Sequence, residues 1–231
     1  MKNVVVTGAN RGLGRELVRQ LRARGDRVFA GCRQPTDEVA TEGAEPMTLD
    51  VASQESIARF VEDLKGRTGR IDLLIHNAGI PHAGEWKTSE GYGSLEFEAL
   101  EKVMRTNGLG PLLLTQACYD LLKGTDRPIV AGITSFFSSL GGRNEFFANN
   151  FGYSMSKVSM NMWLRSLALL KKDEGLRTVV LDPGWVKTDM GGPDAPLTPE
   201  QVVAGCLDVI DGLTDEQSGT YIAWDGKPLP W

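Results

Sequence analysis

Tyr153 and Lys157 are four positions apart in a segment whose apolar residues recur at helical spacing. Residues four apart share one face of a helix, so the lysine ammonium is expected beside the tyrosine phenol. A nearby cation favours the phenolate form and lowers the pKa of a phenol from about 10 toward the physiological range. The pair therefore predicts general acid or base chemistry at a reacting oxygen.

A second pair, Tyr119 and Lys123, has the same spacing. It precedes the strand expected at residues 129–134, with no serine-bearing strand end before it and no proline–glycine loop at the right distance behind it. Tyr153 and Lys157 have both features. We therefore interpret Tyr119 and Lys123 as residues on a solvated helix face.

A glycine-rich loop follows the first apolar run, Val4 to Val6, and leads into a segment with apolar residues at helical spacing. A strand, a glycine loop and a helix in this order form the context of a dinucleotide site. Residues without side chains let the backbone turn sharply and approach a pyrophosphate, whose charge meets the unpaired N–H groups at the start of the helix. The predicted cofactor residues of this loop are Gly8, Asn10, Arg11, Gly12, Leu13 and Gly14.

Short apolar runs alternate along the whole chain with longer segments of helical periodicity. This alternation is typical of βα units around a parallel sheet whose strands are covered on both faces. We predict an α/β fold: a single Rossmann-type doubly wound domain, residues 1–231, with a mostly seven-stranded parallel sheet flanked by helices. Strands are expected at residues 4–6, 27–30, 46–49, 71–75, 129–134, 178–181 and 221–223. Helices are expected around residues 13–21 and 57–64, from about 95 to 122, from about 153 to 171, and from 198 onward.

The composition excludes several classes of protein. The 231 residues suffice for a domain with a sizeable core, and the net charge of −5 gives no general electrostatic footprint for nucleic acid or an anionic membrane. The three cysteines have no CxxC or paired spacing, so neither a disulfide framework nor a metal site is expected. No segment approaches the roughly 20 apolar residues of a membrane span. Together these features predict a cytoplasmic protein.

The glycine loop and the motifs downstream of it resemble the short-chain dehydrogenase/reductase family over nearly the whole chain. The loop has the spacing GxxxGxG, and the other landmarks occur in the family's order. The runs 183–192 and 225–231 look like the carbonyl reductases of this family that are grouped with Sniffer and the bacterial C-factor proteins. The landmarks are Leu49-Asp50-Val51, Asn77-Ala78-Gly79, Asn107, Ser135, Tyr153, Lys157 and Pro183-Gly184.

The resemblance implies an NADPH-dependent oxidoreductase that reduces the carbonyl of an aldehyde, ketone or quinone to an alcohol. Tyr153 would act as the general acid and give its proton to the carbonyl oxygen as the hydride arrives. Lys157 would lower the pKa of Tyr153 and bind the nicotinamide ribose. Asn107 would hold a water that links Lys157 to solvent.

Three serines are candidates for the family's serine, which positions the substrate oxygen. Ser135 follows the run 129–134 directly, at the edge where parallel sheets bind their ligands. Ser135 lies 18 residues before Tyr153 and Ser139 lies 14, while the family spacing is commonly shorter than 18. We expect Ser135 in this role because the strand-end pattern fits the family's position, with Ser138 and Ser139 as alternatives.

The predicted cofactor is NADP(H) rather than NAD(H). An NAD site usually ends its second strand with Asp or Glu, which repels a 2′-phosphate. Here Arg33 occupies that position, and Arg11 supplies a second cation that can bind a phosphate. The nearest carboxylates, Asp37 and Glu38, lie beyond the expected strand end. The resemblance adds cofactor contacts at Asp50, Val51, Asn77, Ala78, Gly79, Tyr153, Lys157, Pro183, Gly184, Val186 and Thr188.

An apolar pocket lined by aromatic side chains is expected at the same edge of the sheet, where it would take a small-molecule carbonyl substrate. Its expected residues are Phe136, Phe137, Trp185 and Met190, with Trp86, Phe146 and Phe147 near the same edge.

A second function stays open, because a fold does not determine a function. The chain could be an NADP(H)-binding sensor or signalling protein with the same fold and little turnover. An alcohol or an imine as the natural substrate is a third alternative. The resemblance also implies a homodimer or homotetramer formed through the two long helices, with Trp163 and Leu167 either on that face or in the core.

Overall fold

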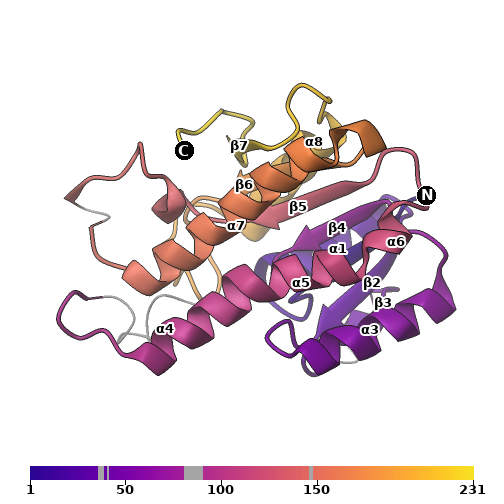
Figure 1. Ribbon diagram of the computed structural model, residues 1–231, viewed down its shortest axis with the longest axis horizontal. Helices are drawn as coiled ribbons and strands as arrows, with labels where there is room; N and C mark the ends of the chain where they lie inside the picture. The colour runs from indigo at the N-terminus through magenta and orange to yellow at the C-terminus, as the bar shows by residue number, and fades with distance from the viewer. Residues whose placement is uncertain (36–38, 41, 81–90, 146–147) are drawn as a thin grey trace.

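Seven parallel strands form one sheet in the order β3-β2-β1-β4-β5-β6-β7 (Figure 1). The structure is a computed structural model, and it describes residues 1–35, 39–40, 42–80, 91–145 and 148–231. The strand order reverses between β1 and β4, and sheets of this kind bind ligands beyond the carboxyl ends of the strands at such a point. The strands are β1 (Asn3–Thr7), β2 (Arg27–Cys32), β3 (Glu45–Thr48), β4 (Leu73–His76), β5 (Ile129–Ile133), β6 (Arg177–Asp182) and β7 (Thr220–Ala223).

All seven expected strands are present, with ends that differ from the prediction by one or two residues. β4 begins at Leu73 instead of residue 71, because the N–H of Ile71 donates to the carbonyl of Leu121 (2.9 Å). β1 lies between two parallel neighbours, with Val5 in register with Phe29 of β2 and Leu74 of β4. The predicted fold class, a doubly wound seven-stranded parallel sheet, is confirmed.

Helices cover both faces of the sheet. α1 and α8 pack together on one face, and α3, α5 and α7 lie on the other (Figure 1). Neighbouring residues of a strand point to opposite faces, so Val4 and Val6 join the apolar cluster under α1 and α8, whereas Val5 joins the cluster under α3, α5 and α7. The helices are α1 (Gly12–Ala23), α3 (Gln54–Arg67), α4 (Phe97–Met104), α5 (Gly110–Ala117), α6 (Tyr119–Leu122), α7 (Phe151–Leu170) and α8 (Pro199–Asp211).

The long helix expected from about 95 to 122, which the amide and the glycine of Asn107-Gly108 predict to be kinked, is divided at that point. A π-helical segment, η2 (Arg105–Leu109), separates α4 from α5, and α6 follows as a separate turn. Close approach of other segments explains the glycines there: a Cβ on Gly108 would lie 2.1 Å from Ser159 Oγ of α7, and one on Gly110 would lie 2.1 Å from the carbonyl oxygen of Val51. Turns of this kind are frequent at functional sites, and this one contains Asn107.

Within the described residues, no helix is long and apolar enough to cross a membrane. In the same part of the chain, no group of three His, Cys, Asp or Glu side chains could hold a metal ion. All three cysteines of the chain, Cys32, Cys118 and Cys206, are buried.

Candidate active site

The glycine loop between β1 and α1 has a backbone that only glycine can supply at two positions. Gly8 has a φ of +66°, and a Cβ there would lie 2.8 Å from Ala78 Cα. A Cβ on Gly14 would lie 2.0 Å from the carbonyl oxygen of Gly8. The N–H of Gly8 donates to Gly31 of β2 (2.8 Å), which fixes the loop on the sheet edge.

The amino end of α1 fits an anion. Arg11 is the N-cap residue and makes no side-chain hydrogen bond to the helix, and the first turn contains no acidic residue. By contrast, Ser53 caps α3 and Thr198 caps α8, each accepting a backbone N–H of its helix. The first N–H groups of α1 are therefore left for an outside acceptor such as a pyrophosphate, and Asn10 and Leu13 lie beside them.

A threonine and an asparagine join the ends of β1 and β4. Thr7 Oγ1 accepts the N–H groups of Asn77 (3.1 Å) and Ala78 (3.0 Å). Asn77 Nδ2 donates in return to the carbonyl oxygens of Thr7 (3.0 Å) and Gly8 (3.1 Å). The Asn77 side-chain amide thereby holds the glycine loop against the segment that follows β4. The sequence prediction included Asn77 and Ala78 but missed Thr7, whose signal is a polar residue at the end of an apolar strand.

The two arginines expected near a 2′-phosphate are both exposed at the same sheet edge. Arg33 follows β2 and Arg11 follows β1, and these strands are neighbours in register from Asn3 and Arg27 onward. Arg11 pairs with Asp189 at 3.1 Å, with the two side chains 60% and 75% exposed. Ion pairs this exposed contribute little to stability, so Arg11 can readily exchange Asp189 for another anion.

Asp50 and Val51 follow β3 at this edge. Asp50 Oδ1 accepts the N–H of Ala52 (2.9 Å), and the Asp50 N–H donates to Ser56 Oγ (2.9 Å), so the turn is rigid. Val51 is 5% exposed and belongs to the apolar cluster under α3 and α5. Its side chain is therefore a core side chain.

Asn107 is fully buried in η2 and binds the segment that follows β4. Its Oδ1 accepts the N–H of Ile80 (2.9 Å), and its Nδ2 donates to Ile80 O (3.3 Å) and to Ser156 Oγ of α7 (3.1 Å). Gly79 lies against this group, because a Cβ there would be 3.4 Å from Asn107 Oδ1 and 3.5 Å from Lys157 Nζ. Asn107 of η2 and Lys157 of α7 therefore both lie next to Gly79.

Lys157 is 4% exposed, and its Nζ donates to the carbonyl oxygen of Ile133 at the end of β5 (2.8 Å). The Nζ atom lies 5.8 Å from the centroid of the Tyr153 ring. Burial disfavours the ammonium form and lowers the pKa of Lys157 to about 8. This amine is therefore poised to gain or lose its proton close to neutral pH.

Tyr153 is 7% exposed on α7, with its ring 6.1 Å from that of Phe137 in an edge-to-face arrangement. Burial raises the pKa of Tyr153 to about 12, a hydrogen bond with the Ser135 side chain opposes that rise, and the charge of Asp182 adds to it. The lowered pKa predicted from the sequence depends on an oxidised nicotinamide as well as on Lys157, whereas in the protein without cofactor burial of the phenol outweighs the hydrogen bond from Ser135.

Ser135 is the serine that the structure pairs with Tyr153. Ser138 is 2% exposed, and its Oγ donates to the carbonyl oxygen of Ser135 (2.5 Å) and accepts from Asn161 Nδ2 (2.9 Å). Ser139 is 1% exposed, and its Oγ donates to Pro230 O (2.6 Å). Both alternatives are thus engaged in structural contacts, and the geometry favours Ser135.

The loop after β6 reaches back to the glycine loop. A Cβ on Gly12 would lie 3.4 Å from Thr188 Cγ2, and the Arg11–Asp189 ion pair lies beside this contact. The loop begins with Pro183 and Gly184, and Gly184 has a φ of +69°. Val186 is 5% exposed and packs in the core under α1 and α8.

The expected pocket residues lie in two segments of this edge. Phe136 and Phe137 are half-buried in the short 3₁₀ helix η3 (Phe136–Ser138), directly after Ser135. Trp185 and Met190 are 56% and 43% exposed on the loop after β6, and Trp185 Nε1 donates to Gly191 O (2.7 Å). Asp37, Glu38, Trp86, Phe146 and Phe147 lie outside the described residues.

His76 ends β4 close to Lys157 and is fully buried. Burial, with a smaller contribution from the charge of Lys157, lowers the pKa of His76 to about 3, so the imidazole is neutral at physiological pH. Its Nε2 lies 2.7 Å from Thr115 Oγ1, and its ring contacts the edge of Trp163. Trp163 and the partly buried Leu167 are accordingly core residues rather than a surface face.

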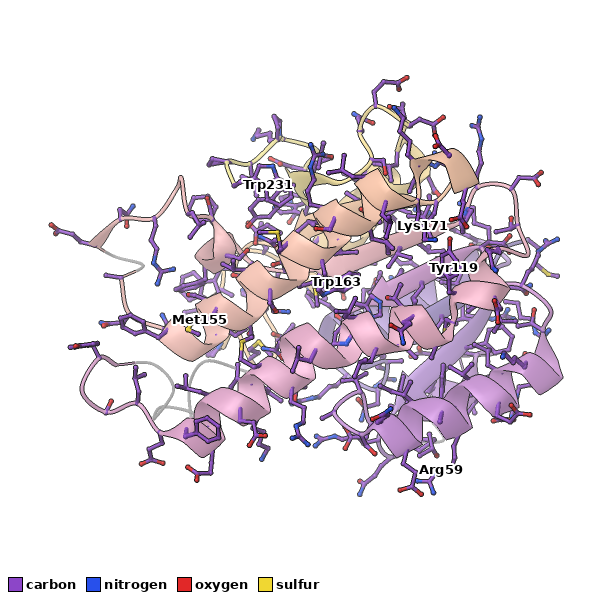
Figure 2. The ribbon with its side chains drawn as sticks, viewed as in Figure 1. Arg59, Tyr119, Met155, Trp163, Lys171 and Trp231 are labelled. Atoms are coloured by element: carbon purple, nitrogen blue, oxygen red, sulfur yellow. The ribbon has the colours of Figure 1, made fainter. Side chains whose placement is uncertain are left out.

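Tyr119 lies at the opposite end of the molecule from the site. Its hydroxyl donates to Glu174, and Lys171 Nζ lies 4.7 Å from the ring centroid. Figure 2 shows Tyr119 beside Lys171, at the end of α7 away from Met155. Lys123 pairs with Asp120 on the surface (3.3 Å). The second Tyr–Lys pair therefore joins α6 to the end of α7.

Two charged residues of the site were not predicted from the sequence. Arg143 Nη1 donates to the carbonyl oxygen of Phe137 (2.9 Å) and to Ser154 Oγ (3.1 Å), which joins the loop after β5 to α7. Asp182 ends β6 with its carboxylate buried. An acid at the end of the apolar run 179–181, directly before Pro183, was the available signal for Asp182.

Comparisons identify similar proteins of known family. The sequence model of the short chain dehydrogenase family matches residues 2–196. The C-signal protein of Myxococcus xanthus is 40% identical over 164 residues, which cover 71% of this chain and 95% of that protein. The NADPH-bound carbonyl reductase from chicken fatty liver superposes with a TM-score of 0.91 at 30% identity and covers 100% of this chain and 99% of its own. Carbonyl reductase Sniffer of D. melanogaster gives a TM-score of 0.89 at 26% identity, over 100% of both chains.

The buried amine predicts an unusual lysine titration. In protein labelled with ¹³C at lysine Cε, one resonance should titrate with a midpoint near pH 8, because burial disfavours the protonated form. That titration should disappear in Lys157→Met and persist in Lys123→Met, the matched variant of the exposed Tyr–Lys pair. A wild-type spectrum in which no lysine titrates below pH 9.5 would contradict the buried position of the amine.

Proposed function

Because the chain belongs to the short-chain dehydrogenase family, we propose that it is an NADPH-dependent oxidoreductase that reduces an aldehyde, ketone or quinone to an alcohol. One observation carries the proposal. Ser135 and Lys157 both lie beside Tyr153, at the sheet edge where the glycine loop ends β1. An acid, a hydrogen-bonding hydroxyl and a cation at a dinucleotide loop are the groups that carbonyl reduction requires.

The cofactor is NADP(H). The glycine loop and the uncapped start of α1 fit a pyrophosphate, and the exposed Arg33 and Arg11 fit the charge of a 2′-phosphate. The chicken liver carbonyl reductase, which this chain resembles over its full length, has NADPH bound. On the loop after β6, Thr188 lies against Gly12 of the glycine loop, and Thr188 and Gly184 would hold the nicotinamide end. When bound, the nicotinamide supplies the hydride.

Tyr153 donates the proton. With a pKa of about 12, the buried phenol is neutral throughout the physiological pH range. It can therefore give its proton to the oxygen of a substrate carbonyl when the carbonyl carbon receives the hydride. The Ser135 hydroxyl shares the hydrogen bond with the phenol and orients the same oxygen. The phenolate left behind is stabilised by protonated Lys157 and recovers its proton from solvent, so the alcohol is the only product of the carbonyl.

The substrate is an apolar or aromatic carbonyl compound. The half-buried rings of Phe136 and Phe137 lie next to Ser135 and Tyr153, and Trp185 and Met190 expose large apolar side chains on the loop after β6. The side chain of Arg143, which donates to the carbonyl oxygen of Phe137, is also engaged with Ser154 Oγ.

A homodimer or homotetramer remains part of the proposal, with Trp163 and Leu167 excluded from its contact face. Large apolar side chains are exposed along α5 and α7, including Leu113 (40%), Met162 (66%) and Leu169 (65%). The odd number of cysteines, with no paired spacing in the sequence, supports a reducing compartment such as the cytoplasm.

A second candidate function is that of an NADP(H)-binding signalling protein with little turnover. The observation that favours it is the 40% identity to the protein named C-signal. The pairing of Tyr153 with Ser135 and Lys157 argues for turnover, because a protein that only binds the cofactor needs no proton donor. The two candidate functions differ in whether the activity of the cofactor-bound protein requires the Tyr153 hydroxyl.

Tyr153→Phe should lower kcat for carbonyl-dependent NADPH oxidation by about 10²- to 10⁴-fold, the usual contribution of a general acid. The dissociation constant for NADPH should change less than threefold, since the ring remains in place. The measurements are absorbance loss at 340 nm with aromatic aldehydes, ketones and quinones, and quenching of protein fluorescence by NADPH. Tyr119→Phe, the matched variant at the distant pair, should leave both values unchanged.

Two outcomes would contradict the enzyme assignment. The first is wild-type protein that binds NADPH tightly and oxidises it with no carbonyl of the panel. The second is a Tyr153→Phe variant with wild-type turnover. Unchanged biological activity of Tyr153→Phe with intact NADPH binding would favour the signalling function.

Arg33→Ala should weaken NADPH selectively. Loss of a charge-assisted hydrogen bond costs about 1.5–3 kcal/mol, so kcat/KM for NADPH should fall about 10- to 100-fold while that for NADH changes little. Arg59→Ala is the matched control, because Arg59 is an exposed arginine of α3 paired with Glu55 (2.8 Å) and lies away from the sheet edge (Figure 2). Equal losses with NADPH and NADH would refute the role of Arg33 in binding the 2′-phosphate.

A further inference from the structure

A buried carboxylate lies between the two loops that form the candidate active site. Asp182 is the last residue of β6 and is 8% exposed. Its Oδ1 accepts the backbone N–H of Phe136 (3.1 Å) and the backbone N–H of Gly184 (3.1 Å). A single oxygen therefore holds two segments that are 48 positions apart in the sequence.

Each of these N–H groups belongs to a loop of the candidate active site. Phe136 begins η3 and directly follows Ser135, the serine beside Tyr153. Gly184 belongs to the loop whose Thr188 contacts the glycine loop, and its φ of +69° and the nearby Leu197 Cδ1, 2.9 Å from where a Cβ would be, restrict the position to glycine. Movement of either loop would break a bond to the same atom.

The backbone of Ser135 has a second set of anchors on the same side. Its carbonyl oxygen accepts from the hydroxyl of Tyr221 on β7 (2.7 Å) and from Ser138 (N–H, 2.8 Å). With the Phe136 N–H held by Asp182, both the carbonyl and the N–H of the Ser135–Phe136 peptide group have partners, so the direction of that peptide group is fixed. The Ser135 hydroxyl is consequently aimed by its backbone rather than by its own rotamer alone.

The charge of Asp182 also acts on its neighbours. Burial raises the pKa of the Asp182 carboxyl, the N–H groups of Gly184 and Phe136 oppose that rise, and Asp225 adds to it. The negative charge raises the pKa of Tyr153 on α7, and it has the same effect on Tyr221 on β7 and Cys206 on α8. Asp225, Tyr153, Tyr221 and Cys206 are thus titratable groups whose electrostatics are coupled to this carboxyl.

We propose that Asp182 is a positioning residue that couples the Ser135 loop to the loop after β6. The proposal rests on the function proposed above. Because Asp182 accepts both N–H groups, the position of the Ser135 hydroxyl depends on the position of the loop after β6. The carboxylate disfavours the phenolate, which is the form that cannot protonate a carbonyl oxygen.

The test uses two variants and a matched control in the full-length protein. Asp182→Asn keeps an oxygen that accepts both N–H groups and removes the charge, whereas Asp182→Ala removes both. Asp26→Asn is the control, because Asp26 is a carboxylate of similar burial (9%) that accepts the Lys2 N–H (2.8 Å) at the far edge of the sheet. The readouts are amide hydrogen exchange at Phe136 and Gly184, the NADPH dissociation constant, and kcat and KM against pH.

In Asp182→Ala, both amides should exchange at least tenfold faster, and the NADPH dissociation constant and carbonyl KM should each rise at least tenfold. In Asp182→Asn, exchange and NADPH affinity should stay within threefold of wild type, but the alkaline limb of log kcat should move to lower pH, because loss of the negative charge lowers the pKa of Tyr153. Asp26→Asn should move none of these readouts.

Unchanged exchange at both amides in Asp182→Ala would overturn the coupling, and an unmoved alkaline limb in Asp182→Asn would overturn the effect on Tyr153. Should the alanine variant fail to fold, exchange faster than threefold in Asp182→Asn with Asp26→Asn unaffected would also overturn the coupling. Hydrogen exchange and NADPH binding need no turnover. A wild-type protein that reduces no carbonyl would therefore refute the proposed function while these two readouts still decide the coupling.

Discussion

The burial of one ammonium group, that of Lys157, is the constraint on which the arrangement of the site depends. A charged group taken out of water is costly unless it is paired, and here the only acceptor among the described residues is the carbonyl oxygen of Ile133. α7 can bring Lys157 this close because a Cβ on Gly132 would lie 2.5 Å from Leu164 Cδ1, so β5 has no side chain there. The glycine and the π-helical turn around Asn107 thus let two helices and a strand meet at one amine.

The same burial has opposite consequences for the two partners of the Tyr–Lys pair. It lowers the pKa of the Lys157 amine to about 8 and raises that of the Tyr153 phenol to about 12, since water stabilises the charged form of each. The cofactor-free site therefore holds a neutral acid beside an amine that can take either protonation state. That arrangement suits reduction, in which the phenol must still carry its proton when the carbonyl substrate arrives.

Much of this could be predicted from the sequence, because local patterns determine it. The seven apolar runs gave seven parallel strands, the glycine spacing gave the loop before α1, and the motifs gave the short-chain dehydrogenase family and its likeness to Sniffer, which the comparisons confirm. What the sequence could not supply depends on the third dimension. The effect of burial on Tyr153 and the role of Asp182 both arise from segments that meet only after folding. The choice of Ser135 over Ser139 and the break of the long helix at Asn107-Gly108 follow from the sequence, and the contact of Ser139 with Pro230 adds a structural reason for the first.

The most direct test of the central claim is to follow the label from NADPH that carries deuterium at C4 of the nicotinamide, with each of the two C4 epimers in separate reactions. The account predicts that mass spectrometry finds one deuterium on the carbinol carbon of the alcohol product with one epimer and none with the other, and that Tyr153→Phe greatly slows the formation of this product. Alcohol that forms without deuterium from either epimer, or no alcohol from any carbonyl under conditions of saturating NADPH, would contradict hydride transfer at this site.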